Sequence, residues 1–234
     1  GAQVLSFSGR EVEIEQLEEW FSASVSASVC LITGPGGTGK TRLCVEWCRR
    51  LRQRGEIAGL LPLMEEDREL DALFAGQGHR VVVIDYAESQ LSLLCQILER
   101  MARRKGNEAR FRLVLIARIA GDWWDGLSVK TRERRVVGLV KRALHIRLEP
   151  LLEQTGARQQ YFTAAYSQFS SLHGDVLSKI PELDWKIEWT SQPLFLQMAA
   201  LAALDGKTIT DSRELLRETI EHEKRYWWRR GKTL

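Results

Sequence analysis

One glycine-rich segment has the spacing of a phosphate-binding loop, G-x-x-x-x-G-K-S/T. Glycines allow a tight turn in which successive backbone N–H groups point at phosphate oxygens. The lysine is placed to contact the β- and γ-phosphates of a nucleoside triphosphate, and the hydroxyl after it to ligate Mg²⁺. The segment therefore predicts binding of ATP or ADP with Mg²⁺, through Gly34, Pro35, Gly36, Gly37, Thr38, Gly39, Lys40, Thr41 and the adjacent Arg42.

An acidic group follows a strongly apolar run at residues 81–84. Asp85 ends this run, where a carboxylate from a neighbouring strand holds the metal ion of a phosphate-binding loop. The next residue is Tyr86 rather than a second acidic residue, and Glu88 comes three positions after Asp85. Glu88 is either the general base that orients water or merely the start of the next helix. If this is an enzyme, we expect slow or regulated hydrolysis of the nucleotide.

A further candidate is Arg118, which ends the apolar run 113–117. If the runs are parallel strands of one sheet, Arg118 emerges at the same edge as Lys40 and Asp85. A guanidinium there would strengthen contact with a triphosphate over a diphosphate, as a switch requires. The alternative is an arginine that faces solvent.

Short apolar runs alternate with helical patterns through the first 150 residues. We expect strands at 28–33, 57–63, 81–85, 111–117 and 143–148, and helices at 12–21, 38–54, 66–74, 91–104 and 136–142. This alternation predicts an α/β fold whose parallel sheet is covered on both faces. Past Pro150 we expect only helices, near 151–170, 193–204 and 211–229, with an irregular stretch at 171–192. The predicted domains are therefore 1–150, which binds the nucleotide, and 151–234, which is helical.

The composition is that of a folded globular protein, with 44% hydrophobic and 28% charged residues. A net charge of +3 is too small to predict a nucleic-acid partner, although it does not exclude one. Positive charge gathers in two basic stretches, which would meet phosphate or an acidic protein surface unless they are solvated helix faces. They comprise Arg100, Arg103, Arg104 and Lys105, then Lys130, Arg132, Arg134, Arg135, Lys141 and Arg142.

The cysteines and the apolar runs bear on the compartment. The four cysteines lack the paired spacing of zinc or redox sites, which favours a reducing environment. No apolar run approaches the roughly 20 residues that cross a bilayer, and no signal peptide pattern opens the chain. We therefore expect a cytoplasmic protein without a membrane partner.

As a whole, these motifs resemble the STAND class of signalling P-loop ATPases, to which NACHT and NB-ARC proteins belong. The resemblance rests on Phe7-Ser8-Gly9-Arg10-Glu11, GPGGTGKT, VVVIDYAE, the strand ending in Arg118, and Ser191-Gln192-Pro193-Leu194-Phe195-Leu196. The VVVIDYAE segment and Gly121-Asp122-Trp123-Trp124 look more like bacterial members of the class. The resemblance implies a P-loop NTPase sheet of the ASCE or AAA+ type, followed by a small all-helical domain.

The resemblance also implies roles for residues outside the loop. Ser8, Gly9 and Arg10 would contact the adenine, and Pro193 of the helical domain would close over the base. Tyr86 departs from the pattern, because a second acidic residue usually stands beside the aspartate. A winged-helix domain would ordinarily follow and does not fit before Leu234, so the sensor and effector domains would lie in parts of the protein outside this chain.

The function that the resemblance implies is an ATP-dependent molecular switch. Exchange of ADP for ATP would change the orientation of the two domains and permit self-association into an oligomer, in signalling and, for a bacterial member, antiphage defence. One rival is a motor-type AAA+ ATPase that acts on nucleic acid or protein by steady turnover. Another is a nucleotide-stabilised interaction module without useful hydrolysis, which Tyr86 favours.

Overall fold

A computed structural model describes residues 7–61, 67–76, 78–104, 109–130, 134–173, 182–207 and 211–217. The chain divides into two compact units, one formed by residues 10–149 and the other by residues 1–9 and 150–234. Most of the predicted last helix, from residue 218 onward, lies outside the described residues. Within the described ranges, no helix is both long enough and apolar enough to cross a membrane.

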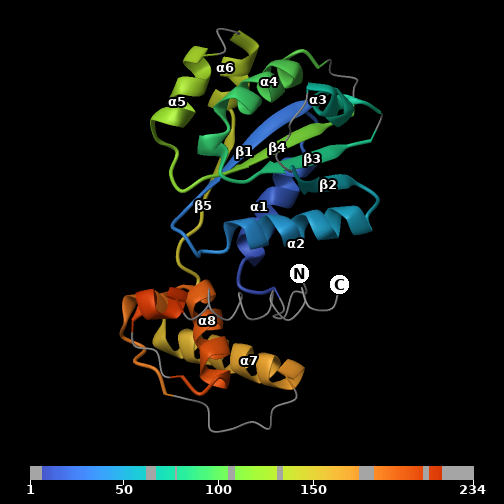
Figure 1. Cartoon of the computed structure of the whole chain (residues 1–234). Helices are drawn as coiled ribbons and strands as arrows, with labels where there is room; N and C mark the ends of the chain where they lie inside the picture. Colours follow the sequence, from blue (N-terminus) through green and yellow to red (C-terminus); the bar gives the residue numbers. More distant parts are fainter. Residues whose placement is uncertain are drawn as a thin grey trace, which may run out of the picture. The chain divides into compact units, whose positions relative to one another are not determined.

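The unit formed by residues 10–149 is built on a five-stranded sheet in the order β2-β3-β4-β1-β5 (Figure 1). Each neighbouring pair is parallel. All six residues of β4 are buried, as expected for a central strand with both faces covered. The predicted α/β fold, a parallel sheet flanked by helices, is confirmed. The strands are β1 (Ala27–Thr33), β2 (Ile57–Leu60), β3 (Arg80–Ile84), β4 (Phe111–Ile116) and β5 (Leu144–Arg147).

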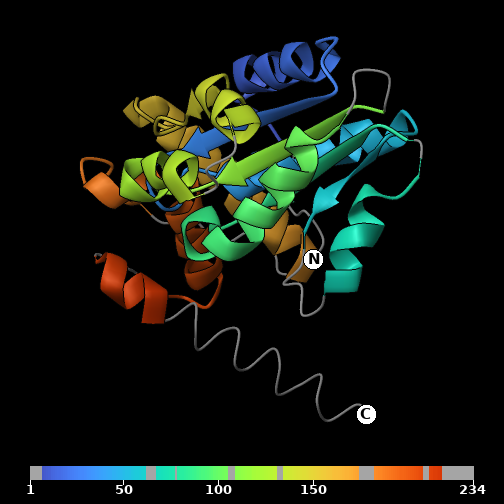
Figure 2. The ribbon, with the colours of Figure 1, turned by 90° about the horizontal axis from the view of Figure 1, so that it is seen from above.

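Helices cover both faces of this sheet (Figure 1). One face carries α3 (Asp67–Phe74), α4 (Leu91–Ala102), α5 (Gly121–Lys130) and α6 (Arg134–Lys141), and Figure 2 looks down on α4, α5 and α6. The other face carries α1 (Glu11–Ser22) and α2 (Lys40–Gln53), which meet where Phe21 packs edge-on against Trp47. Alternate residues of each strand therefore face two separate apolar layers.

Helix α5 was not predicted from the sequence. Its core contacts come from Trp124 and Leu127, which are buried, while Gly121 and Gly126 lower its helix propensity. Its four apolar residues, Trp123, Trp124, Leu127 and Val129, do not recur with a clear helical period. The expected strand at 57–63 is shorter than predicted and ends at Leu60.

The regular elements described in the second unit are all helical. It contains α7 (Thr155–His173), a 3₁₀ turn η2 (Glu188–Ser191) and α8 (Pro193–Leu204), whose apolar side chains form one core. Arg158 of α7 donates to the carbonyls of Leu152 and Trp185 at 2.8 Å each. These bonds hold the irregular segment before α8 against α7.

Helix α2, which carries the end of the phosphate-binding loop, contains a buried carboxylate. Glu46 accepts hydrogen bonds from Arg49 at 2.8 Å and from Arg50 at 2.9 Å. The bonds from Arg49, reinforced by Arg50, lower the pKa of Glu46 to about 2, although burial opposes them. Because the folded pKa is depressed, this stabilisation is complete above the ordinary pKa of 4.5 and is lost as the pH falls toward 2.

We expect Glu46→Gln to lower the free energy of unfolding by about 1 kcal/mol near neutral pH, because the three charge-assisted bonds from Arg49 and Arg50 are weakened. The loss should shrink as the pH approaches about 3, where the native carboxylate begins to protonate. Urea unfolding at both pH values measures it, with exposed Glu15→Gln of α1 as the control. An equal loss at both pH values would mean that packing, not charge, holds Glu46 in place.

Candidate nucleotide-binding site

The glycine-rich loop joins the end of β1 to the start of α2. Gly34, Gly37 and Gly39 have φ angles of 150°, 79° and 90°, in the region of backbone space that favours glycine. Gly39 is also the N-cap residue of α2, so the helix begins directly at Lys40. The strand, loop and helix therefore follow one another as the motif predicts.

The loop packs closely against the ends of two neighbouring strands. The Gly34 N–H donates to the Arg118 carbonyl after β4 at 3.2 Å. A Cβ atom on Gly34 would lie 2.6 Å from the Leu148 carbonyl oxygen after β5. Within the loop, the Thr38 hydroxyl donates to the Pro35 carbonyl at 2.9 Å. The backbone at Gly34 thus has no room for a side chain.

We expect Gly34→Ala to lower the free energy of unfolding by about 2 kcal/mol or more, because it adds both a backbone clash and an unfavourable φ. Gly36→Ala is the matched control, since a Cβ there meets nothing within 4 Å. Denaturant unfolding without nucleotide measures the difference. Equal stability of the two variants would show that the loop is free to move away from Leu148.

The side chain of Lys40 folds back over the loop. Its Nζ donates to the carbonyl oxygens of Gly34 at 2.6 Å and Pro35 at 2.8 Å. An ammonium group has three donors, so it can contact phosphate oxygens from the same region of the loop. Lys40 therefore lies where the motif requires a cation.

The two predicted metal ligands are in direct contact. The Thr41 hydroxyl, on the first turn of α2, donates to Asp85 Oδ2 at 2.7 Å. Asp85 follows β3, and its Oδ1 accepts the N–H of Tyr86 at 2.9 Å. Hydroxyl and carboxylate oxygens are the hard ligands that Mg²⁺ prefers alongside phosphate and water. The chemistry of these residues therefore fits the ion.

The chain reverses sharply after Asp85. Tyr86 has a φ of 52°, and it is the only residue other than glycine in the described ranges with a positive φ. Its side chain is 64% exposed. The 3₁₀ turn η1 (Ala87–Ser89) follows, and Gln90 Nε2 donates to the Asp85 carbonyl at 2.9 Å, which ties the turn to the end of β3. Nothing in the sequence pattern pointed to Gln90, because its partner is backbone.

This turn determines the position of Glu88. One carboxylate oxygen, Oε2, is buried and has no hydrogen-bond partner within the described residues. A buried carboxylate oxygen without a partner is costly, and a ligand or water that donates to it would relieve that cost. Glu88 lies in η1, before α4 begins at Leu91, so it does not form part of that helix.

The electrostatics link the four predicted catalytic residues. The pKa of the Lys40 ammonium is lower than that of an ordinary lysine, mainly because Lys40 is partly buried. The positive charge of Arg118 also lowers this pKa, whereas the negative charges of Asp85 and Glu88 partly offset the decrease. Each of these charges must lie near Lys40 to have this effect. Arg118 is exposed just after β4, at the same sheet edge. One edge of the sheet thus gathers all four.

Arg10 occupies a structural position. Its buried guanidinium donates to the carbonyls of Thr38 at 3.1 Å and Glu149 at 2.6 Å and forms an ion pair with Glu13 at 2.8 Å. It therefore ties the start of α1 to the loop and to the segment after β5. Its sequence-based assignment missed this role, because the acceptors are backbone atoms far away in the chain.

The remaining predicted residues are placed as follows. Arg42 is half-buried on the first turn of α2. Ser8 and Gly9 are exposed, and Pro193 is buried at the first position of α8, where proline suits a helix start. These last three belong to the unit formed by residues 1–9 and 150–234, and their contact with a nucleotide base stays a prediction.

Strand order and site together define a class of protein. A phosphate-binding loop follows β1, an aspartate follows β3, and β4 lies between these two strands in a parallel sheet. This is a P-loop NTPase. Residues 6–222 match the family described as the AAA ATPase domain, and the chain belongs to that family. Comparison with curated proteins finds no matching sequence.

Solved structures show the same fold. Orc1 of Aeropyrum pernix, determined in complex with DNA, is 16% identical with a TM-score of 0.53, over 94% of this chain and 67% of that one. NtrX of Brucella abortus, determined with ATP, is 13% identical with a TM-score of 0.55, over 97% of this chain and 62% of that one. At these identities the likeness extends to the fold alone.

Proposed function

We propose that this chain is the nucleotide-binding part of an ATP-dependent molecular switch. The proposal depends on how the site is composed. Lys40, Thr41 and Asp85, which would bind the nucleotide and its metal ion, meet at one sheet edge, whereas the residue beside Asp85 is the exposed Tyr86. Holding a nucleotide requires only the first feature, and fast hydrolysis also requires a well-placed base. Residues 1–150 would then form the nucleotide-binding domain and residues 151–234 the helical domain.

Each residue of the site has a role in this proposal. Lys40 contacts the β- and γ-phosphates of ATP, and Thr41 with Asp85 holds Mg²⁺, which neutralises phosphate charge when bound. Glu88 orients the attacking water, and Arg118 contacts the γ-phosphate. Ser8, Gly9 and Pro193 would contact the base, while Arg10 would hold the loop that carries the phosphate contacts.

The switch would work through the difference between ADP and ATP. A nucleotide shifts a conformational equilibrium only if it binds the two states with different affinity, and Arg118 would supply that difference through the γ-phosphate. Following the resemblance to the STAND class, we propose that the ATP state permits self-association. The same proposal includes signalling in the cytoplasm, with antiphage defence for a bacterial member. It also includes sensor and effector domains elsewhere in the protein.

A motor-type ATPase is the second candidate. Two findings favour the motor: the chain belongs to the AAA ATPase domain family, and it shares its fold with Orc1. Because Orc1 was solved in complex with DNA, a nucleic-acid partner stays open. A motor needs steady turnover and a competent base. A third candidate, a nucleotide-stabilised module without useful hydrolysis, rests on Tyr86 alone.

Nucleotide content and turnover separate these candidates. We expect the purified chain to retain ADP, identified by chromatography after denaturation, and to hydrolyse ATP well below the roughly 1 s⁻¹ at the lower end of ordinary enzymes. Fast turnover without a trigger would contradict the switch and support the motor. Undetectable turnover with tightly held ATP would support the module, and failure to hold any nucleotide would contradict all three.

A further inference from the structure

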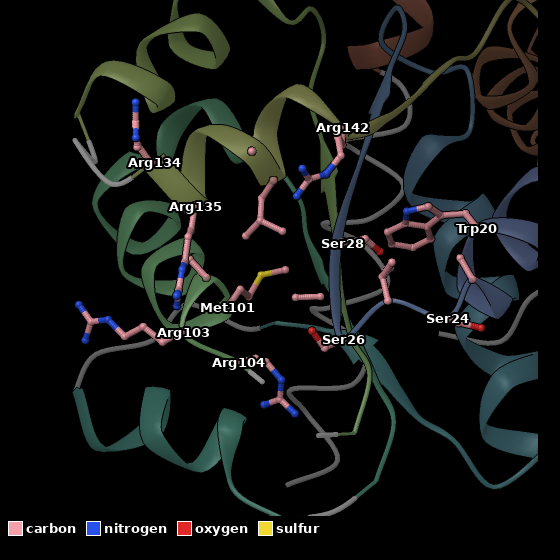
Figure 3. Close-up of a pocket in the computed structure, with 16 residues that line it drawn as sticks. Trp20, Ser24, Ser26, Ser28, Met101, Arg103, Arg104, Arg134, Arg135 and Arg142 are labelled. Carbon is pink, nitrogen blue, oxygen red and sulfur yellow. The ribbon is translucent and has the colours of Figure 1, made fainter. Parts of the chain in front are cut away.

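The two basic stretches of the sequence meet at one groove. The groove lies at the edge of the sheet where β1 starts, opposite the edge that carries the phosphate-binding loop, and its volume is about 1170 Å³ (Figure 3). Its walls are the loop before β1, the end of α4 and the helix α6. Contact between α4 and α6 joins parts of the chain that are well separated in sequence.

Positive charge dominates this groove. Figure 3 shows Arg135 extending from α6 toward the end of α4, and Arg142, directly after α6, lying beside that helix. None of the described residues that line the groove is acidic. The Arg142 guanidinium lies over Gly138, where an added Cβ would be 3.3 Å from Nη2, so the missing side chain leaves space for it. The lining arginines are Arg103, Arg104, Arg134, Arg135 and Arg142.

The loop that forms one wall is held rigidly. Arg112 of β4 is fully buried, and its guanidinium donates to the carbonyls of Val25 at 2.8 Å, Ala23 at 2.6 Å and Phe21 at 3.2 Å. Burial, with a smaller contribution from Arg110, lowers the pKa of Arg112 to about 10, so it is charged at neutral pH. Its charge adds to the positive field at this edge, and the fixed wall needs little ordering when a ligand binds.

We propose that this groove binds the phosphodiester backbone of a single nucleic-acid strand. Arginine presents a planar fork of donors that matches phosphate oxygens, and a groove of one charge sign follows a polyanion. Serine hydroxyls supply further donors along one wall. They include Ser24, which is exposed, and Ser26, which is half-buried.

The apolar side chains of the groove argue against an acidic protein segment. Protein partners usually dock through an exposed apolar or aromatic anchor at the centre of the interface. Here Met101, Ala102 and Leu139 are already at least 91% buried by the chain itself, Trp20 is half-buried, and Val25 is the one large apolar side chain among the lining residues that is substantially exposed. Binding must therefore come mainly from charge and hydrogen bonds, which a phosphodiester backbone offers at every residue.

The inference is independent of the switch, because groove and phosphate-binding loop lie at opposite edges of the sheet. The test uses the whole chain with saturating ATP and Mg²⁺, which keeps the phosphate-binding loop from taking the probe. The probe is a fluorescein-labelled, mixed-sequence single-stranded DNA of about 16 nucleotides, titrated by anisotropy over a series of salt concentrations. The test variant is Arg135→Gln/Arg142→Gln.

We expect the wild type to bind, with an affinity that falls steeply as salt rises. The variant should bind on the order of tenfold more weakly at about 0.1 M salt, and its salt slope should fall by about 1.4, the contribution of two phosphate contacts. Arg213→Gln/Arg217→Gln makes the same charge change at exposed positions of the other unit and should leave both values unchanged.

Several outcomes would overturn the inference. These are no binding by the wild type at low salt, an unchanged affinity of the variant, tighter binding of a duplex of equal length, and displacement of DNA by poly-glutamate at equal charge. Thermal unfolding checks that the variant is folded. If it is not, Arg103→Gln/Arg134→Gln replaces it and must show the same reduction.

Discussion

Replacing Lys40 by alanine is expected to abolish retention of nucleotide and to weaken ATP binding by at least about 100-fold. The Lys40 ammonium lies over the loop, within reach of phosphate, and each hydrogen bond from a charged group contributes about 1.5–3 kcal/mol. Two such bonds correspond to a factor of about 100 or more in affinity. Alanine also removes the only cation that the motif itself supplies.

Isothermal titration calorimetry with ATP and with ADP, each with Mg²⁺, measures this loss of affinity. Lys141→Ala is the matched control, because Lys141 is an exposed lysine at the end of α6. Unfolding by denaturant must show that both variants are folded. If Lys40→Ala held nucleotide as tightly as the wild type, the assignment of the loop as the phosphate site would be wrong.

Replacing Glu88 by glutamine is expected to slow hydrolysis by about 10²- to 10⁴-fold while nucleotide stays bound, because general-base catalysis contributes that much. The positive φ of Tyr86 turns the chain so that Glu88 lies near Lys40, and Glu88 Oε2 is buried without a partner in the described residues. Glutamine keeps the size of the side chain and removes the base.

Single-turnover hydrolysis of bound ATP measures the chemical step directly. Glu19→Gln, an exposed substitution on α1, serves as the control and should hydrolyse at the wild-type rate. If turnover were unchanged in Glu88→Gln, Glu88 would have no part in the chemistry and the base would lie elsewhere. A rate below detection in the wild type as well would favour the module without hydrolysis.

The fold class and the phosphate-binding loop could be predicted from the sequence, because both depend on local pattern. Buried parallel strands appear as continuous apolar runs, such as residues 111–117, and positive φ angles require glycine at Gly34, Gly37 and Gly39. The chemistry of Lys40 and Thr41 follows from their places at the start of the helix. These features involve neighbouring residues, so no knowledge of distant contacts was needed.

Which distant groups meet could not be predicted, because it depends on how the elements pack. Asp85 reaches Thr41 because β3 ends beside the start of α2, a consequence of strand order that no local pattern contains. Arg10 holds the loop through backbone carbonyls, which have no sequence signature. The sequence left the two basic stretches open between solvated helix faces and a surface that meets phosphate or an acidic protein, and the packing of α6 beside α4 places them around one groove. Contacts of this kind depend on how elements pack, which periodicity along the chain does not encode.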